Sequence, residues 1–253
     1  MANINNTLRF TIMSLMRRWP IAMLFLFLSA GYSLWNPLEI ATSTTPSAMI
    51  LDSVIEALWI SILAYAIHEN VFDFFELKPL KTVRSFLIFF VRSLVLSVAS
   101  LMVIMPLILS MESYESMPTI IIALHLLALL VSITVLFSLY AKFGTWLPAS
   151  IVEVRSSISD AWRRGRETSS RAFRSLLWVL ISVFLPALIA MVLVSNLYLS
   201  HIDEFSTDDL SIFEDIVLNV CVGVIMAADA VIFSRAYLVA EGVIKHQAQP
   251  DVA

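Results

Sequence analysis

Six long apolar stretches divide this chain and leave few ways for it to fold. A helix that crosses a bilayer needs about 20 mostly apolar residues. Six segments reach that length, at 19–38, 48–67, 85–109, 118–140, 176–198 and 212–237. Turn-forming pairs such as Asn36-Pro37 and Lys78-Pro79 separate some of them, and polar stretches separate others. The sequence therefore predicts an all-α, polytopic membrane protein with six transmembrane helices. It forms one domain over 1–245, followed by a short cytoplasmic tail at 246–253.

The positive charges test this count independently, because Lys and Arg concentrate in the cytoplasmic loops of membrane proteins. Every Lys and Arg except Arg92 falls before the first span, between spans two and three, between four and five, or at the end of span six. The opposite loops carry only acidic charges, at Glu39, Glu112, Glu115, Asp203, Glu204, Asp208 and Asp209. We therefore expect a multi-pass protein of the bacterial inner membrane with both termini in the cytoplasm. A cleaved signal peptide is the rival interpretation of the first span, but Leu28-Ser29-Ala30 is a poor cleavage site.

Composition removes several function classes. Hydrophobic residues make up 59% of the chain and charged residues 14%, whereas soluble domains average about 45–50% and about 25%. A net charge of −4 gives no basic footprint for nucleic acid. The single cysteine excludes a disulfide framework, and His68-Glu69 has Phe72 where a zinc motif needs histidine. We therefore expect no cofactor, no metal, no catalytic residues and no enzymatic activity.

Two basic, partly apolar segments are predicted to lie as amphipathic helices on the cytoplasmic face, at about 4–18 and 151–172. In the first, apolar residues recur at helical spacing among polar and basic ones: Ile4, Leu8, Ile12, Leu15 and Met16, with Asn5, Arg9 and Arg17. Helices of this kind lie in the headgroup layer, where basic residues are attracted to anionic lipid. The lipid- or partner-binding residues that we predict in and just after the second segment are Arg155, Arg163, Arg164, Arg166, Arg171 and Arg174. Anionic headgroups are the expected ligand, with a nucleotide or an acidic protein surface as alternatives.

Ionisable residues within the apolar stretches form a candidate intramembrane polar site, because such residues are costly in a bilayer. From the outer side, Glu56 lies about 12 Å deep and Asp52 about 6 Å deep, with His125 at a depth of about 10 Å. Glu56 and His125 could form a proton or cation site. The alternative is that these residues line a small outer polar cleft.

On the inner side, Arg92 and Asp229 lie at similar depths, about 10 and 12 Å from the cytoplasmic ends of spans three and six. Opposite charges at matching depth predict an ion pair. The alternative is that Arg92 extends to the cytoplasmic phosphates, which leaves Asp229 to find another partner.

One stretch resembles a known family. Leu147-Pro148-Ala149 runs into Val152-Glu153, followed by Ala161-Trp162-Arg163-Arg164 and Arg171-Ala172-Phe173-Arg174. This pattern is similar to that of the glycerophosphoryl diester phosphodiesterase membrane-domain family, whose layout is shared by the YciC-like six-span inner-membrane proteins. The chain departs from the family at Gly165-Arg166, where Ser-Trp is common. The resemblance implies the six-span architecture without the phosphodiesterase activity, which belongs to a separate soluble barrel domain.

These features favour a non-enzymatic membrane protein that organises lipid or a partner complex at the cytoplasmic face. The alternative is a small transporter or channel that uses the intramembrane charges. An intramembrane enzyme is a more distant third.

Overall fold

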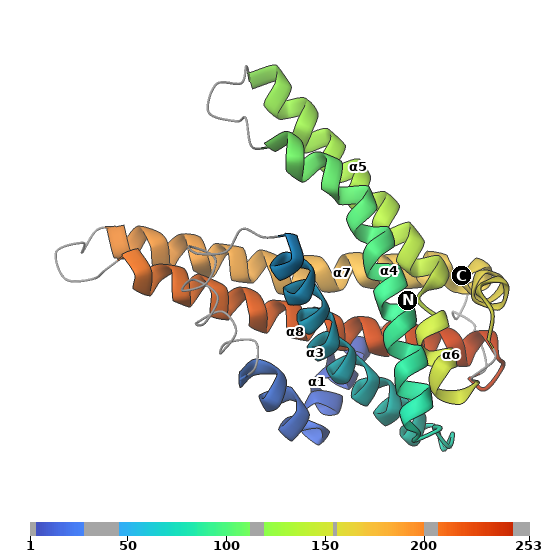
Figure 1. The fold of residues 1–253 in the computed structure, drawn as a ribbon. Helices are drawn as coiled ribbons and strands as arrows, with labels where there is room; N and C mark the ends of the chain where they lie inside the picture. The colour runs from blue at the N-terminus through green and yellow to red at the C-terminus, as the bar shows by residue number, and fades with distance from the viewer. Residues whose placement is uncertain (1–3, 28–45, 112–118, 154–155, 200–206, 245–253) are drawn as a thin grey trace, which may run out of the picture.

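The computed structural model describes residues 4–27, 46–111, 119–153, 156–199 and 207–244, and within them the fold is all-α (Figure 1). The helices are α1 (Ile4–Arg17), α3 (Pro46–Phe74), α4 (Val83–Met111), α5 (Thr119–Phe143), α6 (Trp146–Val152), α7 (Ile158–Leu199) and α8 (Thr207–Ala240). A further helix, Trp19–Phe27, follows α1 after a bend of 85°.

Long apolar helices confirm a multi-pass membrane protein. Four helical segments are long and apolar enough to cross a bilayer: Val83–Ser100, Leu127–Val152, Ile158–Val194 and Val217–Ala240. The bent pair Arg9–Arg17 and Trp19–Phe27 makes a fifth if it counts as one span. The described part of the chain therefore supports four or five of the six predicted spans.

The helices form two long hairpins that share one base. The α4–α5 hairpin and the α7–α8 hairpin meet near the short helix α6, and their far ends diverge (Figure 1). Large apolar side chains lie exposed along the diverging arms, among them Val95 and Met102 on α4 and Leu185 and Ile189 on α7. Lipid is the natural solvent for such surfaces.

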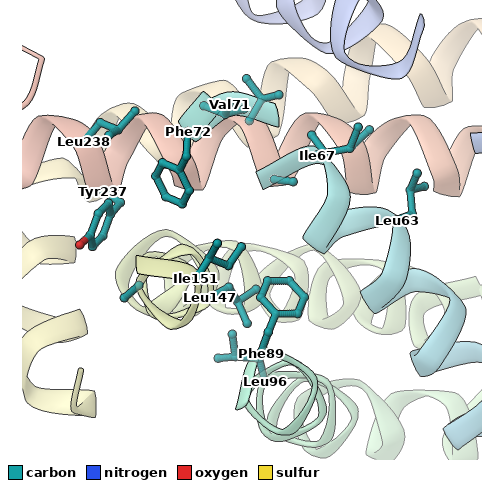
Figure 2. Packing of buried hydrophobic residues seen from close by; sticks show 14 of the residues in the cluster. Leu63, Ile67, Val71, Phe72, Phe89, Leu96, Leu147, Ile151, Tyr237 and Leu238 are labelled. Atoms are coloured by element: carbon teal, nitrogen blue, oxygen red, sulfur yellow. The ribbon is translucent and has the colours of Figure 1, made fainter. Parts of the chain in front are cut away.

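The well-packed core lies at the shared base. Figure 2 shows Phe72 of α3, Phe89 of α4, Ile151 of α6 and Tyr237 of α8 turned toward one another. A second cluster joins Ala141 of α5, Leu176 and Val179 of α7, and Ala228 and Phe233 of α8. Packing at the base therefore holds the two hairpins together, while few of the side chains that the structure describes along their outer arms are buried.

The structure differs from the sequence prediction at the second amphipathic segment. The predicted helix at 151–172 is wrong in its bounds. Ile151 belongs to α6, which ends at Val152, and the next helix begins at Ile158. From Ile158 one helix of 42 residues runs to Leu199, through Pro186. At about 1.5 Å per residue this helix is roughly 63 Å long, twice the thickness of a bilayer core. The basic segment is thus the first part of α7 rather than a separate helix. The first amphipathic segment does form a helix at the expected place, α1.

Candidate functional site

Arg92 anchors α4 to the chain around α6. Its Nη1 donates to the carbonyl oxygen of Trp146 (2.8 Å) and its Nη2 to that of Ser156 (2.7 Å). The guanidinium carbon also lies 5.0 Å from the centre of the Trp146 ring, and the indole Nε1 donates to the same Ser156 carbonyl (3.2 Å). Arg92 is 6% exposed. A charged group bonded to two carbonyls at this burial acts as a structural clamp between α4, α6 and the segment that leads into α7.

Arg164 approaches Ser156 from the other side. One guanidinium nitrogen pairs with Glu241 Oε1 at the end of α8 (3.1 Å), and the other donates to the Ser156 hydroxyl. The guanidinium lies 5.1 Å from the centre of the Tyr237 ring, and the Glu153 carboxylate is 3.9 Å away. Arg164 is 3% exposed. Ser156 is therefore held by one arginine from each hairpin.

A groove of about 450 Å³ opens on this network. Its lining residues are Leu80, Glu153, Ser156, Asp160, Arg163, Arg164 and Glu241. The Leu80 wall is fixed, because its N–H donates to the Ile151 carbonyl (2.7 Å) and its carbonyl accepts from the Tyr65 hydroxyl (3.2 Å). The groove thus joins the loop before α4, the start of α7 and the end of α8.

The first turn of α7 is capped by Ser157 and Asp160. The Asp160 carboxylate accepts from the N–H (2.9 Å) and from the hydroxyl (2.7 Å) of Ser157, and the Ser157 hydroxyl accepts from the Asp160 N–H (3.2 Å). This reciprocal capping satisfies amide groups that a helix start otherwise leaves open. The hydrogen bonds from Ser157 lower the pKa of Asp160, and Arg164 and Arg163 act in the same direction.

The predicted basic residues separate onto different faces of α7. Arg164 points into the protein, next to the buried residues Ala161, Gly165 and Thr168. Arg163, Arg166, Arg171 and Arg174 are exposed, and Arg155 lies outside the described residues. On a helix of 3.6 residues per turn, positions 163, 166, 170 and 174 fall opposite the buried face. We call Arg163, Arg166 and Arg174 the basic face of α7.

Two of the predicted intramembrane residues can be placed. Arg92 bonds to the carbonyls described above, and no ion pair joins it to Asp229 among the residues that the structure describes. Asp229 lies within electrostatic range of the Tyr140 hydroxyl, which has Ser97 and Ser100 of α4 as polar neighbours. Asp52, Glu56 and His125 lie in α3 and α5, but their side chains are outside the described part, and so is the predicted contact between Glu56 and His125.

Packing between α7 and α8 fixes which residues of the two helices lie at the same height along the helix axes. Arg164 meets Glu241, and Leu176 packs in one cluster with Ala228. Asp229, next to Ala228, is therefore level with Leu176. The predicted spans began at 176 on α7 and ended at 237 on α8, so those two boundaries are offset by about eight residues, or about 12 Å.

Some residues in this region gave no recognisable sequence signal. Ser156 is one serine among many, and it becomes a hub only because two distant helices meet there. Gly165 is another, since a Cβ there would collide with the backbone carbonyl of Lys142 on α5. A third case is Arg18, which lies 3.7 Å from both Glu69 and Asp73.

No group of three or more metal-ligating side chains occurs among the described residues. Comparisons with protein-family models, curated proteins and solved structures found no match.

Proposed function

We propose that this chain is a six-span protein of a bacterial inner membrane, with both termini in the cytoplasm. The base of the molecule supports this orientation, because residues that precede or follow predicted spans meet there: Arg18, Lys81, Arg164 and Glu241. The likeness of 147–174 to the phosphodiesterase membrane-domain family points to the same architecture.

Reporter fusions after residues 40, 115, 205 and 245 test this topology. An enzyme that is active only in the cytoplasm should work at 245 and fail at the other three, and an enzyme active only outside should give the opposite pattern. Cytoplasmic activity at 115 or 205 would contradict the six-span arrangement.

The proposed activity is binding of anionic lipid headgroups by the basic face of α7, without catalysis, so that the protein organises lipid or a partner complex. The observation that carries this proposal is the sorting of arginines on α7. The buried Arg164 serves the fold, whereas Arg163, Arg166 and Arg174 are exposed. Arginines at the cytoplasmic end of a span are well placed for phosphate oxygens, which they bind in a bidentate manner.

The first helix supports a lipid-facing surface at the same level. In α1 the hydroxyl-bearing residues Thr7, Thr11 and Ser14 are buried, while Ile12 and Met16 are 55% and 70% exposed. Ser14 accepts from Asn70 Nδ2 of α3 (2.9 Å). An amphipathic helix with its polar side against protein and its apolar side exposed is suited to the interfacial region of a membrane.

A lipid-retention measurement tests the proposal. The purified protein is exchanged into mixed micelles of phosphatidylglycerol and phosphatidylcholine, and bound lipid is counted by native mass spectrometry. A basic residue near an anionic surface contributes about 1 kcal/mol, so Arg166→Gln with Arg174→Gln should weaken phosphatidylglycerol binding at least tenfold. The matched control is Lys78→Gln with Lys81→Gln, two exposed lysines between α3 and α4, and it should retain most of the binding. Equal loss in both pairs, or no loss in either, would contradict a role of the basic face.

A transporter is the second candidate, and the environment of Asp229 favours it. This carboxyl group lies in a predicted span, within electrostatic range of the Tyr140 hydroxyl on α5, and ionisable groups within a span are typical of proton carriers. If this carboxyl group carries protons, Asp229→Asn should abolish proton flux in liposomes while Glu76→Gln, an exposed carboxylate elsewhere, leaves it intact. Proton flux no higher than in empty liposomes would rule out the proton-carrying version of this candidate.

A further inference from the structure

The groove at the start of α7 carries opposite charges on a rigid frame. Its walls include the carboxylates Glu153, Asp160 and Glu241 and the guanidinium groups Arg163 and Arg164. Its volume, about 450 Å³, falls within the range of about 300–1,000 Å³ typical of small-molecule sites. This site is separate from the basic face of α7, although Arg163 borders both.

Several charged atoms in the groove still have capacity to bind. The Glu153 side chain is 49% exposed, and its only recorded ion pair within the described residues is the long one of 3.9 Å to Arg164. Arg163 is exposed and takes part in no ion pair between described residues. Arg164 also lines the groove, but it is 3% exposed and already bonded to Glu241 and Ser156, so it contributes positive potential beside Arg163.

The sign of the charges restricts the ligand. A simple anion would approach Arg163 and Arg164 but would also face three carboxylates. A simple cation would face the two arginines. A ligand with an ammonium group and an anionic group a few atoms apart can satisfy both sets at once.

We propose that this groove binds a small zwitterion, with its ammonium group on Glu153 and its anionic group on Arg163, beside the positive charge of Arg164. An amino acid has this chemistry, and so does the headgroup of an aminophospholipid. The frame requires little rearrangement, because Ser156 is held by Arg92 and Arg164, and Leu80 by Ile151. The inference does not rest on the lipid binding proposed for the basic face.

L-serine tests whether the ligand is a soluble amino acid. Its binding to the detergent-solubilised full chain is measured by calorimetry. Its matched comparators are ethanolamine, which lacks the carboxylate, and 3-hydroxypropionate, which lacks the ammonium group. Each charged contact removed should weaken binding at least about tenfold. Phosphatidylserine is the probe for a lipid source, compared in nanodiscs with phosphatidylglycerol, which has the same net charge and no ammonium group.

Variants separate the groove from its surroundings. Glu153→Gln and Arg163→Gln should each reduce binding of the probe at least about tenfold. Glu167→Gln on α7 and Arg84→Gln on α4, exposed residues outside the groove and outside the basic face, should leave it unchanged. L-serine binding or a preference for phosphatidylserine over phosphatidylglycerol, lost in the first pair only, supports the site and identifies the source. The inference is overturned if neither probe exceeds its comparators, or if the two pairs of variants behave alike. Failure of the basic-face proposal would instead appear as unchanged phosphatidylglycerol binding in the Arg166 and Arg174 double variant.

Discussion

Individual arginines on this molecule have different roles that their charge alone does not reveal. Arg92 donates to two backbone carbonyls and lies over an indole ring. Arg164 joins Glu241, Ser156 and Tyr237. Arg166 and Arg174, in contrast, are exposed. The planar, multidentate guanidinium group is what lets the first two hold several partners at once.

Replacement of Arg92 should destabilise the base of the molecule. Hydrogen bonds to a charged group contribute about 1.5–3 kcal/mol each, so Arg92→Ala should lower the free energy of unfolding in detergent by at least about 2 kcal/mol. Arg92→Lys should recover only part of this loss, because an ammonium group lacks the fork that reaches both carbonyls. The charge swap of Arg92→Asp with Asp229→Arg should give no rescue. A double variant as stable as the parent would show that the two residues do pair.

Gly165 is a second residue whose role depends on a neighbour from another helix. Gly165→Ala places a methyl group against the Lys142 carbonyl of α5. Such overpacking costs about 1–3 kcal/mol, measurable as a lower unfolding midpoint. Ser170→Ala, at an exposed position one turn further along α7, should stay within about 0.5 kcal/mol of the parent. Gly165→Ala at or above the stability of the parent would show that α5 and α7 can move apart without cost.

At the scale of the element, α7 behaves as one long helix whose two halves have different surroundings. Its first half is basic and begins at the Ser157–Asp160 cap, and its second half is apolar and exposed at Leu185 and Ile189. The hydrogen bonds of this cap predict how the stability of α7 depends on pH.

Acid should weaken the start of α7. Hydrogen bonds from Ser157 hold the pKa of Asp160 below its ordinary value of about 3.9. The folded-state pKa is therefore below the unfolded one. The stabilisation is present above about pH 4 and is lost as the pH falls through the folded-state value. Comparison of unfolding midpoints from pH 7 down to about pH 3 should show a steeper decline in the parent than in Asp160→Asn. Parallel declines would contradict this assignment.

At the scale of the whole molecule, the two hairpins share a packed base and diverge outward (Figure 1). Twelve residues along each helix from the Arg164–Glu241 pair, Leu176 of α7 and Asp229 of α8 lie at about the same level. Segments 176–199 and 207–229 are each about 35 Å long, which suits a hydrocarbon core of about 30 Å.

Depth measurements can check this register. Spin labels on cysteines introduced at Leu177 and Asp229, with the native Cys221 replaced, should report depths within about one helical turn, or roughly 5 Å. Span boundaries predicted from hydropathy alone put these positions about 10 Å apart in depth. A difference of that size would show that α7 and α8 pair in another register.

Apolar stretches of sufficient length predict helices in a membrane from local sequence alone, since a bilayer forces each such segment to satisfy its backbone hydrogen bonds internally. The helix at Ile4–Arg17, the break between α3 and α4 and the all-α class follow from the same kind of local pattern. The break of the 151–172 segment before Ile158 does not, because basic amphipathic periodicity is the same whether a helix lies on a membrane or extends a span.

Only the tertiary structure decided which charges are buried and what they bind. Matching depth suggested that Arg92 pairs with Asp229, yet Arg92 reaches carbonyls that become neighbours only when α4 packs against α6. Arg164 looked like any other arginine of a basic segment until α8 brought Glu241 and Tyr237 beside it. The physical reason is that helix register and rotation depend on contacts between residues far apart in the chain, whereas hydropathy and periodicity record only each helix by itself.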